Sequence, residues 1–297
     1  MTTEPRALRS RPDVVQPAVR PARVWLTRLR RNPLFAAGTV IIVTFVLVGI
    51  LAPHIAPYPP ISVDSLSMFQ SPSRVHLFGT DRFGRDILSR VMFGVRVSLG
   101  IAGLSIGVAA TAGALLGLLA GYFEHGMDQW LGRLMDIFFA FPSVLLALGI
   151  SAVLGAGVTT VVIAIAVVYT PLFFRVMRAS VLAEKQLTYV EAAASIGAGS
   201  WKIMSRHILP NTLSPMVVQI AVSLSYAILI ESALSYLGVG VQPPTPSWGT
   251  ILNEGKEFLP ISPWISLFPG VFIMLSVLGL NFVSDGLRDY LDPRLRT

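Results

Sequence analysis

The sequence predicts an all-α, polytopic membrane protein with six transmembrane helices. Three observations indicate this fold class: the composition, a set of long uncharged runs and a one-sided distribution of basic residues. Of the 297 residues, 53% are hydrophobic and 13% are charged, and the mean hydropathy is +0.68. Soluble domains carry about twice this share of charged residues. The predicted helices cover residues 34–52, 96–122, 136–154, 158–177, 211–236 and 264–284.

The lengths of the uncharged runs define these spans. A transmembrane helix needs about 20 apolar residues. The run at 137–174 is too long for one pass, and the turn residues at 154–157 divide it into two. Glycines at small-xxx-small spacing are expected to permit close helix contact: Gly103, Gly107, Gly113, Gly117 and Gly121. Three prolines are expected to kink helices: Pro142, Pro171 and Pro269.

Basic residues orient the six spans. Residues 1–33 contain eight arginines. Nine further basic residues lie in connections and in a C-terminal tail that are predicted on the same side of the membrane, so this side carries 17 of the 23 lysines and arginines. The positive-inside rule assigns that side, with both termini, to the cytoplasm. The nine are Arg133, Arg175, Arg178, Lys185, Lys202, Arg206, Arg288, Arg294 and Arg296.

The basic N-terminus indicates lipid rather than nucleic acid. Residues 1–22 are expected to be disordered, and residues 23–31 combine arginines with Trp25, Leu26 and Leu29 as a helix lying on an anionic leaflet does. No aromatic-basic recognition module accompanies the net charge of +7. A cleavable signal peptide is the alternative, but the uncharged stretch of 19 residues is long for one, so a retained anchor is favoured.

The predicted organisation has four parts. They are a cytoplasmic basic tail with an interfacial helix (1–33), a first transmembrane helix with an external region (34–95), a five-helix core (96–284) that includes a cytoplasmic loop at 178–211, and a cytoplasmic C-terminal tail (285–297).

A polar insert between two apolar stretches, residues 188–211, is typical of a segment that docks to another protein. Thr188 and Glu191 form a Thr-x-x-Glu capping box, which predicts a helix beginning at Tyr189. The alanines that follow favour helix and leave a surface of little bulk. The candidate docking residues are Tyr189, Val190, Glu191, Ala192, Ala193, Ala194, Ser195, Ile196, Gly197 and Ala198.

The insert also carries its own boundaries. Gly197 is the expected stop signal of the docking helix. Ser200 is expected to cap a second helix that ends at Leu209 and Pro210. The pattern therefore predicts a short helix held at the membrane surface by stiff flanks.

The external region contains a second informative stretch, residues 78–99. An apolar stripe of Phe83, Ile87, Val91 and Val95 predicts an amphipathic helix leading into the second span. Charges at helical spacing predict pairs of Asp81 with Arg85 and of Arg82 with Asp86. An interfacial elbow without a ligand role is the interpretation favoured by these features, and a contact site is the alternative.

The insert closely resembles the coupling loop of ABC-importer permeases, whose pattern is E-A-A, three residues, G, nine residues, I-x-L-P. The matching residues are Glu191, Ala192, Ala193, Gly197, Leu209 and Pro210, while His207 stands at the Ile position. The stretch G-T-D-x-x-G-R-D-x-x-S-R at 79–90 resembles the signature of C-type permeases of dipeptide and oligopeptide importers. Residues 231–252 and 281–296 resemble other segments of that group, so the likeness covers about 34–296.

The resemblance implies a type I-like ABC importer permease fold in a prokaryotic plasma membrane. It implies a heterodimer with a homologous B-type permease, one or two cytoplasmic ATPase subunits that use ATP and Mg, and an external binding protein that delivers peptide. Glu191 would contact the ATPase, Ala192 and Ala193 would allow close seating, and Gly197 would permit the turn. Nickel and glutathione permeases share much of the pattern, so the cargo stays open between them and peptides.

Other residues are candidates for contacts with the binding protein, a gate or the pathway. The gate or binding-protein candidates are Asp81, Arg82, Arg85, Asp86, Pro243, Pro244 and Trp248. The pathway candidates are Gln219, Ser223, Glu231 and Asn281, for which helix packing or, at Glu231, contact with water is the alternative role.

Catalysis finds no support in the sequence. The chain has no cysteine, its four histidines are scattered, and no G-x-x-x-x-G-K-[ST] motif is present. We therefore expect a transport subunit without a cofactor or metal of its own. A stand-alone secondary transporter ranks lower because paired intramembrane charges and an internal repeat are missing.

Overall fold

The computed structural model describes residues 32–291, and within them the chain is helical, with one isolated bridge between Thr80 and Asp86. The helices are α2 (Pro33–Ile55), α3 (Ile87–Phe123), α4 (His125–Phe139), α5 (Ser143–Leu154), α6 (Val158–Lys185), α7 (Thr188–Ser195), α8 (Ser200–Ile203), α9 (Leu209–Tyr236), α10 (Trp248–Gly255) and α11 (Trp264–Leu291). Short turns lie at Ser65–Ser67, Met204–Ile208 and Lys256–Phe258. The predicted interfacial helix at 23–31 lies outside the described residues.

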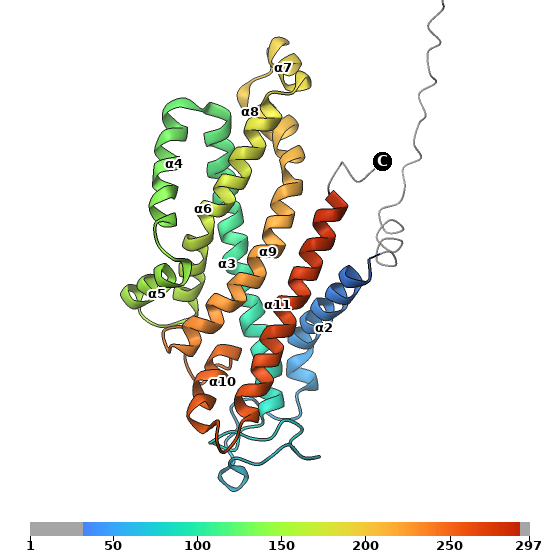
Figure 1. Cartoon of the computed structure of the whole chain (residues 1–297), viewed down its shortest axis with the longest axis vertical. Helices are drawn as coiled ribbons and strands as arrows, with labels where there is room; N and C mark the ends of the chain where they lie inside the picture. Colours follow the sequence, from blue (N-terminus) through green and yellow to red (C-terminus); the bar gives the residue numbers. More distant parts are fainter. Residues whose placement is uncertain (1–31, 292–297) are drawn as a thin grey trace, which may run out of the picture.

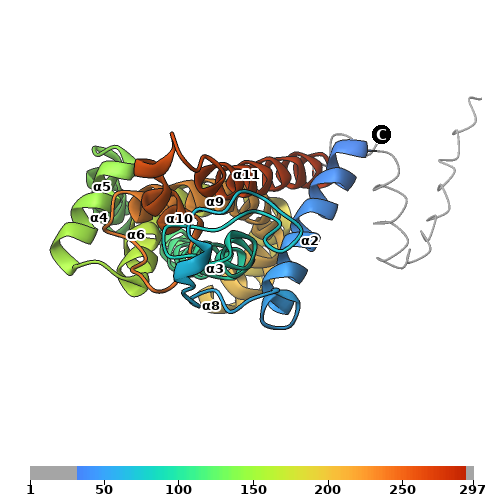
Figure 2. The same cartoon turned by 90° about the horizontal axis from the view of Figure 1, so that it is seen from below.

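The long helices form one bundle with distinct ends (Figure 1). The α7–α8 loop projects from one end, and α10 lies at the other end with the connection between α2 and α3. From below, α3 lies inside the bundle, with α2, α6, α9 and α11 around it (Figure 2), and it packs most extensively on α6. The first described residues of α2 and the last of α11 both point toward the α7 end, as an even number of passes requires.

Within residues 32–291, five helices are long and apolar enough to cross a membrane, and the bent pair α4–α5 makes a sixth if it is counted as one span. The predicted third helix, 136–154, is wrong as a single rod, because α4 and α5 meet at 90°. Pro142 precedes α5 in an extended conformation, with φ −56° and ψ 133°, which ends helical geometry there. The kink expected at Pro142 is thus a complete break.

Ion pairs fix α4 against α6. Arg175 binds Asp136 at 2.6 Å, and Arg178 donates to both carboxylate oxygens of Asp128 through its Nε and Nη2. These pairs join the polar side of α4 to the part of α6 that directly follows its uncharged run. The direction of α4 therefore follows from long-range contacts as well as from the proline.

Close packing between α3 and α6 depends on glycine. A Cβ at Gly113 would lie 2.5 Å from the Cβ of Phe173, and a Cβ at Gly117 would lie 2.6 Å from the carbonyl oxygen of Phe174. By contrast, a Cβ at Gly103 or Gly107 would meet no atom within 4 Å in the described chain. The predicted small-residue contact is thus confirmed for one stripe of α3, while the other stripe faces away from the chain.

Gly113→Leu is expected to destabilise the bundle, because the side chain must displace α6. Overpacking of this kind costs about 1–3 kcal/mol or more. The midpoint of thermal unfolding of the detergent-purified chain measures the effect. Gly103→Leu is the matched control with an unchanged midpoint, and equal losses in both variants would contradict the packing described.

Candidate docking loop and charged cap

The α7 helix presents a small-residue face to solvent and anchors itself through two side chains. Val190 and Ala193 are buried against the chain's own core, whereas Glu191, Ala192 and the residues from 194 to 197 are exposed. Ala193 therefore packs α7 against its own subunit. The expectation that Ala193 would face the ATPase is wrong. The predicted capping box is also wrong: α7 begins at Thr188, and no side chain caps it.

The end of α7 follows the prediction closely. Gly197 has φ +82°, in the left-handed region that glycine favours. The N–H of Gly197 donates to the carbonyl of Ala194 at 3.0 Å, and the N–H of Ala198 donates to that of Ala193 at 3.1 Å. These two bonds form a Schellman motif, which satisfies the last carbonyls of the helix. The motif fixes the direction in which the chain leaves α7.

Tyr189 ties α7 to the two long helices beside it. Its hydroxyl donates to the carboxylate of Glu184 on α6 and accepts from the amide of Asn211 on α9 at 2.9 Å. Partial burial and the bond to Glu184 raise the pKa of the Tyr189 hydroxyl, which favours the protonated, donating form. These bonds connect α7 directly to α6 and α9.

The second helix of the loop runs on without a stop, contrary to the end expected at Leu209 and Pro210. It begins at Ser200, with Gly199 rather than Ser200 as its N-cap, and continues into α9 through a π-helical turn, Met204–Ile208. There the N–H of Leu209 donates to the carbonyl of Met204, five residues back. The wider turn accommodates Pro210, which has no N–H and would clash in a regular helix. The α8 helix and α9 therefore form one continuous helical segment, Ser200–Tyr236.

At the opposite end lies a charged cap, defined here as residues 56–86 with α10. The predicted helix over 78–99 begins only at Ile87, because Gly79 and Gly84 have φ of +75° and +71° and Asp86 is the N-cap. A Cβ at Gly84 would lie 1.8 Å from the carbonyl oxygen of Asp64, so only glycine fits. The charges of the cap are therefore arranged by a loop.

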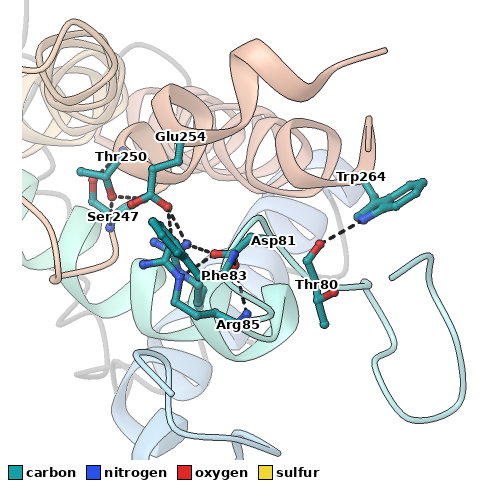
Figure 3. A network of polar contacts seen from close by, with 9 residues as sticks. Thr80, Asp81, Phe83, Arg85, Ser247, Thr250, Glu254 and Trp264 are labelled. Carbon is teal, nitrogen blue, oxygen red and sulfur yellow. Dashed lines mark hydrogen bonds and ion pairs between the residues drawn. The ribbon is translucent and has the colours of Figure 1, made fainter. Parts of the chain in front are cut away.

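Four charged side chains, each exposed by 10% or less, hold the cap together (Figure 3). Arg85 binds Asp81 at 2.6 Å and Glu254 of α10 at 2.5 Å. Arg90 binds the same two carboxylates at 2.5 and 2.6 Å, and its side chain is 1% exposed. Two positive and two negative charges balance, as burial of ions requires. The network joins α3, the connecting loop and α10.

One predicted ion pair is confirmed and the other is wrong. Asp81 and Arg85 pair as expected, whereas Asp86 binds Nδ1 of His76 at 3.0 Å and accepts from the N–H of Ser89. Arg82 is exposed and lies over the ring of Phe83, with 4.6 Å between its guanidinium carbon and the ring centroid. Residues 81–86 form a loop, so the helical geometry that would bring Arg82 to Asp86 is absent, while Asp81 reaches Arg85 across the loop.

Trp248 anchors α10 in the bundle. The side chain is fully buried, and its indole N–H donates to the carbonyl of Val91 at 3.2 Å. Ser247 and Thr250 cap the helix reciprocally. The preceding Pro243 and Pro244 are exposed and joined by a cis peptide bond. Trp248 therefore lies inside the chain, and the gate or binding-protein candidates with exposed side chains are Arg82, Pro243 and Pro244.

The four pathway candidates lie in different environments. Ser223 and Glu231 are fully buried, and Glu231 accepts from the hydroxyl of Ser235 at 2.9 Å. A solute could reach either one only if the helices around it separated. Gln219 is half-buried and donates to Ser223 at 3.1 Å, and Asn281 is exposed. The structure thus does not bring the four together in one cleft.

Arg90 and Glu254 were missed as site residues by sequence reasoning. Arg90 closes the G-T-D-x-x-G-R-D-x-x-S-R stretch, so the shared spacing could have grouped it with Asp81 and Arg85. Glu254 is far away in the sequence, and only its position as a carboxylate within a largely apolar segment hinted at a partner. Among residues 32–291, no group of three or more potential ligands could hold a metal ion.

A multi-span bundle with a projecting helical loop at one end and an ion-paired cap at the other is the arrangement of a permease-type membrane subunit. The family profile described as binding-protein-dependent transport system inner membrane component matches residues 113–297, and the N-terminal TM domain of oligopeptide transport permease C matches residues 21–72. The chain belongs to this family of inner-membrane permease subunits of ABC importers. It is thus a multi-pass inner-membrane transport component, and a separate ATPase hydrolyses the ATP.

Several known proteins are similar along nearly the whole chain. The dipeptide transport system permease protein DppC of Alkalihalophilus pseudofirmus is 40% identical over 100% of this chain and 97% of that relative. A putative peptide transport system permease protein of Brucella abortus is 44% identical, over 97% of this chain and 96% of the relative. The glutathione transport system permease protein GsiD of Pectobacterium atrosepticum is 40% identical, over 92% and 91%.

The fold is also found in a solved structure. An inward-facing structure of the MetNI methionine ABC transporter superposes with a TM-score of 0.57 at 16% identity, covering 69% of this chain and 98% of the other. At this identity the likeness establishes the fold alone. It agrees with the type I-like importer permease architecture.

Proposed function

We propose that this chain forms half of the translocation pathway of an ATP-driven importer of di- and oligopeptides. The observation that carries the proposal is the α7–α8 loop, which projects from one end of the bundle and is hydrogen-bonded to α6 and α9. Peptide as cargo is supported by the names of the relatives at 40–44% identity.

The complex we propose has a homologous B-type permease as the other half of the pathway. Two ATPase domains bind the two α7 helices at the cytoplasmic side, and an external binding protein delivers the peptide at the cap. The arginine distribution supports this orientation. The open stripe of Gly103 and Gly107 on α3 supports a close neighbour outside the chain.

ATP binding closes the two ATPase domains and moves α7 with them. Because Tyr189 links α7 to α6 and α9, and because α8 is continuous with α9, the movement becomes a rigid tilt of these long helices. A tilt of packed helices changes which side of the membrane the pathway faces. The chain itself supplies no catalytic group; ATP and Mg belong to the partner.

Cargo is tested in proteoliposomes that contain the complete complex and its binding protein. We expect ATP-dependent uptake of radiolabelled di- to pentapeptides, with no uptake in the absence of ATP. Glutathione is the second candidate, because GsiD proteins are 40–41% identical to this chain. Uptake of glutathione without uptake of other peptides would select that alternative.

Glu191→Lys is expected to uncouple hydrolysis from uptake while the chain still inserts into the membrane. Glu191 is exposed, and it is the one acidic residue between 188 and 211, so reversal of its charge changes the docking surface without disturbing the core. The ratio of peptide taken up to ATP hydrolysed measures the effect, and Glu191→Gln is the milder control. An unchanged ratio in Glu191→Lys would contradict a docking role for this side chain.

A further inference from the structure

Two large apolar side chains flank the Gly197 turn without joining the chain's own core. Ile196 is 86% exposed and Trp201 is 71% exposed. Both belong to the loop that projects from the end of the bundle (Figure 1). Large apolar side chains gathered on a surface rimmed by polar residues mark contact sites for other proteins.

We infer that Ile196 and Trp201 are the anchors of the ATPase contact, and that the surface which receives them has two apolar recesses bordered by acidic side chains. This inference rests on the proposed docking of α7. On α7 itself, the exposed residues after Glu191 are the small Ala192, Ala194 and Ser195, which offer little area to bury. Trp and other aromatic side chains carry much of the energy of protein interfaces.

The charged residues beside Trp201 indicate which charges should border the receiving surface on the ATPase. Lys202 and Arg206 follow Trp201 and are both exposed, and Glu191 is the single acidic side chain between residues 188 and 211. None of these three has an ion-pair partner among residues 32–291. A partner with carboxylates opposite Lys202 and Arg206 would therefore complement this end of the loop.

The lipid interface is the competing environment for Trp201, since tryptophan is enriched there. However, Trp201 precedes the uncharged run that begins at Ile208, and a helical rise of 1.5 Å per residue places it about 10 Å beyond that run. Lys202 and Arg206 lie between them. This position favours contact with a protein outside the bilayer.

The test measures the dissociation constant of the ATPase for the permease pair in detergent, by titration of fluorescently labelled ATPase. Trp201→Ala is expected to weaken binding by about 30-fold or more, as loss of an interface anchor does. Ile196→Ala should weaken it less, and Trp201→Phe should retain most of the affinity. Trp130→Ala is the matched control: Trp130 is 77% exposed, but it lies on α4, and its replacement should leave binding unchanged.

The outcomes separate this inference from the proposed function. If Gly197→Val weakens binding while Trp201→Ala and Ile196→Ala do not, the anchors are wrong and the docking of α7 stands. If no change in residues 188–206 affects binding, the proposed docking fails as well. A fluorophore attached through Ser200→Cys should be protected from brominated phospholipid in the assembled complex; strong quenching would assign Trp201 to the membrane and overturn the inference.

Discussion

Gly197→Val is expected to abolish ATP-driven uptake while leaving the membrane bundle folded. The expected effect comes from backbone strain and not from a steric clash, because a Cβ at Gly197 would meet no atom within 4 Å. A residue with a Cβ costs about 1–2 kcal/mol in the left-handed region, and a β-branched one is disfavoured further. Valine should therefore open the turn and release the bonds of Gly197 and Ala198 to Ala194 and Ala193. The α7 helix would then dock out of line with α8.

Parallel assays of peptide uptake and ATP hydrolysis in proteoliposomes measure this effect. We expect uptake to fall at least tenfold per ATP hydrolysed, with normal amounts of the chain in the membrane. Gly197→Asn is the matched control, because asparagine tolerates the left-handed conformation. Normal uptake in the valine variant, or an equal loss in the asparagine variant, would contradict the turn as the coupling element.

Arg90→Met is expected to cause the largest loss of stability at the cap. Its removal leaves Asp81 and Glu254 buried with Arg85 as their one remaining cation in the network. Breaking a buried ion network by removing one partner costs about 3–5 kcal/mol. The loop at 56–86 should become sensitive to protease while α7 still docks, since the two lie at opposite ends of the bundle.

Thermal unfolding and limited proteolysis of the purified chain measure this loss. Arg82→Met removes an exposed arginine from the same loop and should change neither. Combining Arg90→Met with Glu254→Gln restores the charge balance and should recover part of the lost stability. If the double variant is no more stable than Arg90→Met alone, electrostatic balance does not hold the cap.

Local signals predicted the long helices and the end of α7, because both depend on nearby residues. Uncharged runs define spans wherever the bilayer is the solvent, and Gly197 stops α7 through its own φ. The signal of Pro142 was also local, but the 90° bend depends on where α4 is held by Arg175 and Arg178. No pattern within α4 shows that direction.

The cap shows more clearly where the spacing of apolar residues fails to predict the structure. The stripe of Ile87, Val91 and Val95 lies on a helix as predicted, and it is fully buried in the bundle, yet Phe83 lies in a loop. Gly79 and Gly84 could have signalled this, since two glycines five residues apart are unfavourable in a helix. The link to Glu254 was beyond prediction because it joins residues separated by more than 160 positions in the chain.

The central claim is that α7 docks on a separate ATPase and passes its movement to the pathway. The chain has no cysteine, so Ala192→Cys creates a single exposed thiol on α7. The measurement is cross-linking of this thiol in the native membrane complex, with identification of the product by mass spectrometry. We predict a cross-link to an ATPase subunit, with a yield that changes when ATP is added. A chain that gives no ATPase cross-link and still moves solute in liposomes without ATP would contradict the account.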